Sequence, residues 1–314
     1  MTRETGTGKY EQALSRCRNL DPVSTAVAHP CDETSLAGVV EAHSKGLITP
    51  ILVGPVAKIR DVAARHGIDI GKFRLVDAPH SHAAAAQAVE LVRQGEAELL
   101  MKGSLHSDEL LGAVVARETG LRTARRISHA FIMDVPTYHK VLLVTDAAIN
   151  IAPTLEDKVD ICQNAIDLMI ALGKHTPKVA ILAAVETVSS KMPATIDAAC
   201  LCKMADRGQI TGAMLDGPLA FDNAISSEAA QIKGIRSEVA GDPDILLVPD
   251  LEAGNILAKQ LTFLANADCA GIVLGARVPI ILTSRADSVR ARGASCAVAV
   301  LAAHARRRGL QATV

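Results

Sequence analysis

The sequence has very few aromatic residues. It contains no Trp, two Tyr and four Phe among 314 residues. Proteins that bind single-stranded nucleic acids stack the bases on aromatic side chains. A net charge of −1 also provides no general attraction for a polyanion. We therefore expect no nucleic-acid partner, and a core built from Ala, Val, Leu and Ile.

Long apolar runs are missing as well. No run approaches the roughly 20 residues that a membrane helix needs, and the first twelve residues are polar, without a signal-peptide core. The seven cysteines are odd in number and show no Cys-x-x-Cys spacing, which favours reduced, mostly buried thiols over disulfides. These absences predict a cytoplasmic protein with no membrane partner.

Short apolar runs alternate with longer helical patterns along the chain. Because parallel strands are joined by helical crossovers, this alternation predicts an α/β fold of parallel sheets covered by helices. The expected strands are Thr25–His29, Thr49–Val53, Phe73–Asp77, Glu98–Met101, Ala130–Val135, Val141–Thr145, Val179–Ala184, Thr211–Leu215, Ile245–Val248, Gly271–Leu274 and Ile280–Thr283. The expected helices include Pro55–His66, Ala83–Arg93, Asp108–Glu118, Leu155–Leu172 and Ser288–Arg307.

Eleven strands are many for one doubly wound sheet, so we expect two α/β subdomains. The strands Ala130–Val135 and Val141–Thr145 are joined too tightly for a helical crossover. They therefore pair antiparallel, or they carry the chain from one subdomain to the other. We place residues 1–137 and 286–314 in subdomain I and residues 138–285 in subdomain II. Together they form one domain of about residues 20–310.

Polar segments lie at the ends of five expected strands. Open parallel sheets bind their ligands beyond the carboxyl ends of the strands, so five such segments indicate a shared site for an anionic substrate. Four of them follow a strand, and Arg122–His129 precedes one. The segments are Met101–Asp108, Arg122–His129, Leu215–Asn223, Val248–Asn255 and Thr283–Ser288.

Two of these segments are candidate anion sites. Gly103 lets the backbone approach a ligand, and Ser104 and His106 supply donors beside a helix N-terminus. A Ser107 helix cap with an incidental His explains that segment equally well. The basic cluster Arg122–His129 is typical of a solvated loop. It alternatively binds phosphate through Arg126 and Ser128, which strand alternation sends to the same side.

The other three segments carry acids, amides and hydroxyls. Asp216-Gly217-Pro218 is a strong turn signal that leaves a binding role for Asp216 open. Asn255 either caps a helix or holds a substrate carbonyl. The segment with Ser284, Arg285 and Asp287 brings a hydroxyl, an anion clamp and a possible base to one place.

These segments, in this order, resemble the phosphate acetyltransferase and phosphate butyryltransferase family. The resemblance runs from about Asp21 to Ala305, and the chain is also similar to the acyltransferase part of bifunctional enoyl-CoA hydratase/phosphate acetyltransferases. The motifs that carry it are Lys102-Gly-Ser-Leu-His-Ser107, Ser128-His-Ala-Phe-Ile-Met133, Leu215-Asp-Gly-Pro-Leu-Ala-Phe-Asp222, Val248-Pro-Asp-Leu-Glu-Ala-Gly-Asn255 and Thr283-Ser-Arg-Ala-Asp-Ser288. It implies a fold like isocitrate and isopropylmalate dehydrogenases, with an active-site cleft between two α/β subdomains, and a homodimer.

The resemblance implies a reversible reaction in which a short acyl group, acetyl or butyryl, passes from acyl-CoA to inorganic phosphate. The products are acyl phosphate and CoA, and neither a metal nor a cofactor beyond CoA is required. Arg285 is then the oxyanion clamp, Ser284 contacts the sulfur or the carbonyl, and Asp287 is the nearest carboxylate for a base. The implied substrate-binding residues are Gly103, Ser104, His106, Arg126, Ser128, Asp216 and Asn255, with phosphate against Ser104, His106, Arg126 and Ser128.

One departure leaves the base open. Acetyl-type members carry a carboxylate seven residues beyond the Ser that matches Ser284, and this chain has Ala291 there. The pattern is closer to butyryl-type members, and either Asp287 serves or proximity and Arg285 suffice. The missing acid also motivates an alternative, a CoA- or phosphate-binding regulatory protein that kept the fold and lost the chemistry. A β-decarboxylating dehydrogenase is disfavoured, because no Gly-x-Gly-x-x-Gly follows the first strand.

Overall fold

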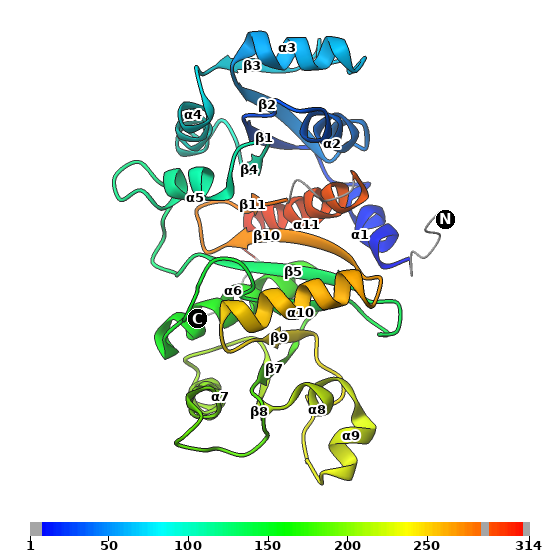
Figure 1. The fold of residues 1–314 in the computed structure, drawn as a ribbon, viewed down its shortest axis with the longest axis vertical. Coiled ribbons are helices and arrows are strands. Elements are labelled where there is room, and N and C mark those ends of the chain that lie inside the picture. Colours follow the sequence, from blue (N-terminus) through cyan, green and yellow to red (C-terminus); the bar gives the residue numbers. More distant parts are fainter. Residues whose placement is uncertain (1–7, 284–288, 310–314) are drawn as a thin grey trace. The chain divides into compact units, whose positions relative to one another are not determined.

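The computed structural model describes residues 8–283 and 289–309. Its contacts divide the chain into two compact units (Figure 1). Unit 1 is built on Arg126–Cys269, and unit 2 on Tyr10–Arg125 together with Ala270–Arg307. This division falls earlier in the chain than the expected boundaries after residues 137 and 285, because the hairpin that follows Arg126 stays within one unit. Where the functional domains begin and end stays a prediction.

Unit 2 contains a mostly parallel set of strands. Their order is β3-β2-β1-β4-β11-β10, and β1 pairs in parallel with both β2 and β4. The exception to parallel pairing in this set is the antiparallel pair of β10 and β11, because residues 275–279 between them are too few for a helical crossover. The strands are β1 (Val23–Ala28), β2 (Ile48–Gly54), β3 (Arg74–Asp77), β4 (Leu99–Lys102), β10 (Asp268–Leu274) and β11 (Ile280–Ile281).

Helices cover both faces of these strands. In Figure 1, α4 and α2 lie on opposite sides of β1, and α11 packs against α2. Asp32 caps α2, since its Oδ1 accepts a hydrogen bond from Ser35 N at 2.7 Å. The helices are α1 (Lys9–Cys17), α2 (Glu33–Ser44), α3 (Val56–Arg65), α4 (Ser81–Arg93), α5 (Ser107–Val115) and α11 (Val289–Arg307).

Unit 1 repeats this architecture around a shorter set of strands. The order is β5-β6-β9-β7-β8, with β5 antiparallel to β6 and the other pairs parallel. The antiparallel hairpin is one of the two arrangements expected for these strands. The strands are β5 (Ser128–Asp134), β6 (Leu142–Thr145), β7 (Lys178–Leu182), β8 (Met214–Leu219) and β9 (Ile245–Leu247). The helices are α6 (Leu155–Ala171), α7 (Pro193–Asp206), α8 (Phe221–Ile225), α9 (Ser227–Ile232) and α10 (Leu251–Phe263).

The expected turn at Asp216-Gly217-Pro218 is wrong. These residues lie inside β8, which runs from Met214 to Leu219. β8 is the last strand of unit 1 and pairs on one side only, with β7, so a proline without an N–H is tolerated there. A register shift between Ala180 and Leu182 of β7 accommodates the irregular strand.

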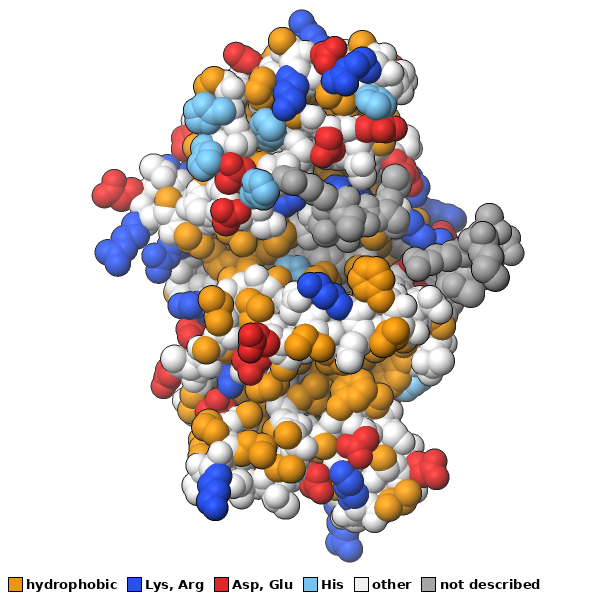
Figure 2. Space-filling model, viewed as in Figure 1, with side chains coloured by type: hydrophobic (Ala, Val, Ile, Leu, Met, Phe, Trp, Pro, Cys, Tyr) orange, Lys and Arg blue, Asp and Glu red, His pale blue; other side chains and the backbone are white. Residues whose placement is uncertain are grey.

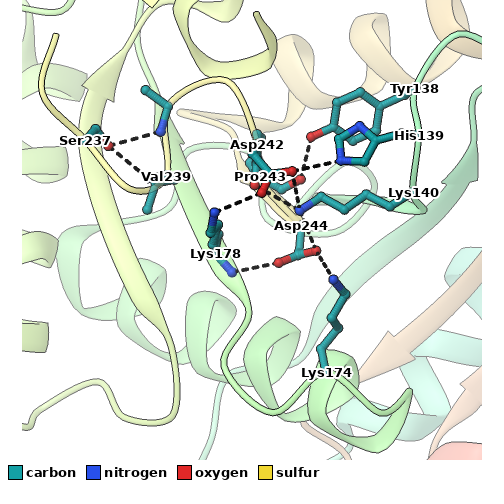
Figure 3. A network of polar contacts seen from close by, with 11 residues as sticks. Tyr138, His139, Lys140, Lys174, Lys178, Ser237, Val239, Asp242, Pro243 and Asp244 are labelled. Atoms are coloured by element: carbon teal, nitrogen blue, oxygen red, sulfur yellow. Dashed lines mark hydrogen bonds and ion pairs between the residues drawn. The ribbon is translucent and has the colours of Figure 1, made fainter. Parts of the chain in front are cut away.

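A network of charged residues lies at the amino-terminal edge of unit 1 (Figure 3). Asp244 directly precedes β9 and accepts a hydrogen bond from Lys178 N at 2.9 Å. Its carboxylate also pairs with Lys140 and Lys174 at 2.9 and 3.0 Å. Asp242 pairs with Lys140 and Lys178, both at 2.8 Å. Partial burial alone would raise the pKa of Asp242, but these two lysines hold it well below its usual value.

The core of both units consists of Ala, Val, Leu and Ile, as the composition predicts. All seven cysteines are free, and four of them are buried. Burial raises the pKa of the Cys162 and Cys296 thiols to about 12. In the part of the chain that the structure describes, no helix combines the length and apolar character required to span a membrane.

Candidate active site

The carboxyl ends of β1 and β4 in unit 2 approach each other closely at Gly103. Gly103 N donates to Ala28 O, and Ser104 N donates to His29 O, both at 2.9 Å. A Cβ on Gly103 would lie 2.5 Å from Ala28 O and 2.6 Å from His29 O, which no side chain tolerates. Gly103 is therefore required by the meeting of two backbones. A role in binding a ligand, as the sequence suggests, stays a prediction.

Ser104 and His29 form the centre of this edge. Ser104 Oγ donates to His29 O at 2.8 Å and accepts from Cys31 N at 3.2 Å. His29 Nδ1 lies 3.1 Å from the same Oγ. Burial and the nearby Lys58 lower the pKa of His29, and the carboxylates of Glu109 and Asp32 oppose this more weakly. This shift favours the neutral form of the imidazole.

His106 lies at the start of α5, where the sequence left a choice between an anion site and a Ser107 cap. The structure places His106, not Ser107, at the capping position, and Ser107 is the first residue of the helix. His106 N donates to Glu109 Oε2 at 3.0 Å, so an acid already occupies this helix N-terminus. Although burial of Glu109 would raise its pKa, hydrogen bonds from Ser81 and from His106 N keep it below the usual value. The His106 side chain is exposed.

Two buried cations donate to Thr283, the last described residue before the 284–288 segment. Lys102 Nζ donates to Thr283 O at 3.2 Å, and Arg292 Nη1 from α11 donates to Thr283 Oγ1 at 2.9 Å. Lys102 is 4% exposed and Arg292 is 2% exposed. The candidate catalytic residues Ser284, Arg285 and Asp287 lie outside the described residues. The structure therefore shows how Lys102 and Arg292 fix Thr283, the residue that precedes Ser284.

In unit 1, Arg126 and Ser128 lie where β5 begins, beside the carboxyl end of β6. Arg126 Nε donates to Asn150 Oδ1 at 2.7 Å, and its side chain is 54% exposed. Ser128 is buried, and its Oγ accepts from Asn164 Nδ2 at 2.9 Å. Asn164 Nδ2 also donates to Arg126 O at 2.9 Å. The two residues share one partner, but only Arg126 presents its side chain to solvent.

The loop after β6 folds around the carboxylate of Asp146. It accepts hydrogen bonds from Ala148 N and Ile149 N at 2.9 and 3.1 Å, and from both the backbone and side-chain amides of Asn150. His129 on β5 is fully buried nearby, and its Nδ1 has no hydrogen-bond partner among the described residues. Burial lowers the pKa of His129, while the charge of Asp146 opposes this more weakly.

Asn255 and Asp216 occupy places that the sequence did not predict. Asp250 caps α10, accepting from Ala253 N at 2.8 Å, so Asn255 is not the cap. Asn255 lies within the helix and donates to Ala147 O at 3.1 Å, which fastens α10 to the loop after β6. Asp216 Oδ1 accepts from Gly217 N at 2.9 Å inside β8.

Each unit thus gathers part of the predicted set. Gly103 and Ser104 lie together in unit 2. Arg126 and Ser128 lie together in unit 1, and Asn255 touches the same loop. Asp216 is three strands from β6, or about 14 Å at 4.8 Å per strand. Sequence reasoning missed four further residues at these edges: His29, Asp146, Asn150 and Arg292. A polar residue directly after an apolar strand is a signal that could have found His29 and Asp146.

Comparison with known proteins gives consistent results. Residues 80–300 match the family model described as phosphate acetyl/butaryl transferase. A phosphate acetyltransferase of Rhizobium meliloti is 67% identical over 303 residues, which cover 96% of each chain. A phosphate butyryltransferase of Clostridium acetobutylicum is 41% identical over 294 residues, covering 94% of this chain and 98% of that protein.

Solved structures agree on the fold. A branched-chain phosphotransacylase from Enterococcus faecalis matches with a TM-score of 0.79 and 31% identity, covering 90% of this chain and 99% of that one. A putative 4-hydroxythreonine-4-phosphate dehydrogenase from Salmonella typhimurium matches with a TM-score of 0.56 at 12% identity, over 90% of this chain and 100% of that one, which concerns the fold alone. The expected likeness to a dehydrogenase fold is confirmed.

The fold is that of the phosphotransacylases, a class of α/β enzymes. Within this class, the chain belongs to the phosphate acetyl/butyryl transferase family. The sequence-based prediction of a phosphate acyltransferase is therefore confirmed at the level of the family. Among the described residues, no three His, Cys, Asp or Glu side chains gather as they would around a metal ion.

Proposed function

We propose that this protein catalyses the reversible transfer of a short acyl group between CoA and inorganic phosphate. The observation that carries the proposal is the similarity to a phosphate acetyltransferase, 67% identical over 96% of both chains. Acyl-CoA and phosphate give acyl phosphate and CoA, and no cofactor beyond CoA and no metal takes part. The carboxyl edges of both units carry the polar groups that an anionic substrate requires.

The proposed catalytic residues are Ser284, Arg285 and Asp287. The transition state carries an oxyanion beside a phosphate, and a guanidinium such as Arg285 suits that charge. Support comes from Thr283, which two buried cations fix directly before these residues. We propose substrate-binding roles for Gly103, Ser104, His106, Arg126, Ser128, Asp216 and Asn255. Ser128 is buried and accepts from Asn164, which also donates to Arg126 O, so the role of Ser128 is to position Arg126.

The acyl group is acetyl or a short homologue. The identity to the acetyltransferase exceeds that to the butyryltransferase, 67% against 41%. The Ser284–Ser288 motif nevertheless resembles butyryl-type members more closely, and Ala291 departs from the acetyl-type pattern. Comparing kcat/KM for acetyl-CoA with kcat/KM for butyryl-CoA decides between the two.

We propose a cytoplasmic homodimer. Large apolar side chains are exposed on α10 and just after it, and apolar side chains gather over this helix in Figure 2. Ile256 is 58% exposed, Phe263 72% and Leu264 80%. Such side chains are candidates for burial against a second copy. Light scattering of the purified protein and of a Phe263→Ser variant tests this, since the dimer should weaken in the variant.

Phosphate-dependent release of thiol from acyl-CoA tests the function. We expect release from acetyl-CoA or butyryl-CoA only when phosphate is present, and the same rate after dialysis against a chelator. CoA binding without any turnover would contradict the proposal. Arg285→Ala should abolish turnover, because it removes the guanidinium proposed to stabilise the oxyanion. Asp287→Ala tests whether this carboxylate is the base. Turnover would be lost if Asp287 is the base, and it would survive if electrostatic stabilisation by Arg285 carries the rate.

A further inference from the structure

His29 lies directly after β1, at the edge where parallel strands present ligand-binding groups. β4 lies beside β1, and β11 lies beside β4, all three parallel. At about 4.8 Å per strand, the end of β11 with Thr283 is about 10 Å from the end of β1. His29 therefore shares one edge with Ser104 and with the residue that precedes the proposed catalytic segment.

The hydrogen bonds of Ser104 determine the tautomer of His29. A carbonyl oxygen only accepts, so the single hydroxyl proton of Ser104 points to His29 O at 2.8 Å. With that proton directed to His29 O, we assign the proton of the 3.1 Å contact between this Oγ and His29 Nδ1 to the ring nitrogen. Nε2 consequently carries the lone pair. It has no hydrogen-bond partner among the described residues, and His29 is only half-buried.

The surroundings keep this imidazole neutral. Burial and Lys58 at the start of α3 both lower its pKa, and Asp32 before α2 and Glu109 on α5 do not reverse the shift. A neutral ring with a free Nε2 is a proton acceptor, as a general base must be.

The local backbone is shaped around this residue. His29 has φ +54°, in the left-handed region that few non-glycine residues adopt. Gly103 presses against His29 O on the other side, where a Cβ would be 2.6 Å away. Two unusual backbone features therefore occur where His29 and Ser104 meet.

We propose that His29 is a further catalytic residue, whose Nε2 carries the proton between the sulfur of CoA and the phosphate. This rests on the proposed function. In the direction that forms acyl-CoA, Nε2 takes the thiol proton while sulfur bonds to the carbonyl carbon of the acyl phosphate. The carbon–oxygen bond to phosphate then breaks, and the imidazolium returns the proton to the leaving phosphate. The reverse reaction runs through the same steps, with the proton passing from hydrogen phosphate to the departing sulfur. His29 thereby fills the role left open by Ala291.

His29→Asn is the decisive variant. Asn tolerates a positive φ and places its amide near the position of Nδ1, so the contact to Ser104 is kept while Nε2 is lost. We expect kcat to fall about 100-fold or more with small changes in KM for CoA and phosphate. In the wild type, kcat/KM for CoA should fall at acid pH as His29 is protonated, and this acid limb should disappear in the variant.

A second variant and a matched control keep the test sharp. His29→Gly suits the same backbone and leaves a space, so added imidazole should restore turnover in a pH-dependent manner. His139→Asn replaces an exposed histidine of unit 1 and should leave the kinetics unchanged. Unchanged kcat and an unchanged acid limb in His29→Asn would overturn the inference. A wild type without phosphate-dependent thiol release would instead refute the proposed function.

Discussion

At the amino-terminal edge of unit 1, Asp242 and Asp244 meet Lys140, Lys174 and Lys178 in ion pairs of 2.8 to 3.0 Å. At the carboxyl-terminal edge of unit 2, Lys102 and Arg292 are buried, and both donate to the neutral oxygens of Thr283. Both edges keep several charges close to strand ends. They differ in the partners of those charges, which are opposite charges at the first edge and the oxygens of Thr283 at the second.

The two edges differ in the role of their charged residues. Carboxylates paired with lysines keep the ends of β7 and β9 in register and belong to the fold. Donors aimed at Thr283, and an imidazole held by Ser104, fix the geometry of an edge where open sheets bind ligands. We therefore expect substitutions at the first edge to lower stability alone, and substitutions at the second edge to lower activity as well.

Gly103→Ala should have the largest effect. The new Cβ would meet backbone oxygens of residues 28 and 29 at 2.5–2.6 Å, and a backbone cannot move aside as a side chain can. We expect a loss of about 3 kcal/mol or more in the free energy of unfolding, together with loss of acyl transfer. Urea unfolding measures the first, and thiol release the second.

Gly112→Ala is the matched control for Gly103→Ala. It lies within α5 with no atom within 4 Å of the added Cβ. Alanine there should raise stability by about 0.5–1 kcal/mol, because glycine is the poorer helix former. Equal unfolding midpoints for the two variants would show that the meeting of β1 and β4 is not as tight as described.

Asp244→Asn tests the amino-terminal edge of unit 1. The amide oxygen can still accept from Lys178 N, but the charge that pairs with Lys140 and Lys174 is lost. We expect unfolding to become easier by about 3 kcal/mol with kcat unchanged. Asp206→Asn removes a fully exposed pair with Lys203 and should change neither quantity. A kcat that falls with Asp244→Asn would end the distinction between the two edges.

Thr283→Val tests the carboxyl-terminal edge with a smaller change. It removes the acceptor of Arg292 Nη1 while keeping the shape of the side chain. We expect a loss of about 1–2 kcal/mol in stability and a clear fall in kcat. Thr283→Ser keeps the hydroxyl and should retain most of the activity. If Val and Ser behave alike, the hydroxyl does not position the segment that follows it.

The sequence predicted the fold well because the apolar runs are short and clearly separated. All eleven expected strands exist, and they differ from the observed strands mainly at their ends. The failures have local causes. β8 extends through Asp216-Gly217-Pro218 because an edge strand tolerates proline, and local turn signals do not show where a strand lies in its sheet.

The candidate site was predictable only where residues of one type cluster in the sequence. Ser104 stands out beside Gly103, but its partner His29 is 75 residues away and follows a different strand. In the sequence, nothing distinguishes Arg292 from the other basic residues of the long helix α11. Its burial depends on Gly38 of α2, where a Cβ would lie 2.9 Å from Arg292 Cδ. Such pairings exist only after the strands are ordered in a sheet.

The most gradual effect expected is the pH dependence of stability that His129 causes at the carboxyl edge of unit 1. Burial lowers the pKa of His129 in the folded protein below the ordinary 6.5. Below that pH the unfolded chain binds a proton that the folded protein does not, so stability falls as the pH drops. The loss reaches up to about 1.4 kcal/mol per pH unit until the folded pKa is reached. Urea midpoints at several pH values measure it, with His129→Gln flattening the slope and the exposed His175→Asn leaving it intact. A slope that persists in His129→Gln would assign the acid sensitivity to paired carboxylates such as Asp242, and so to the opposite edge of the unit.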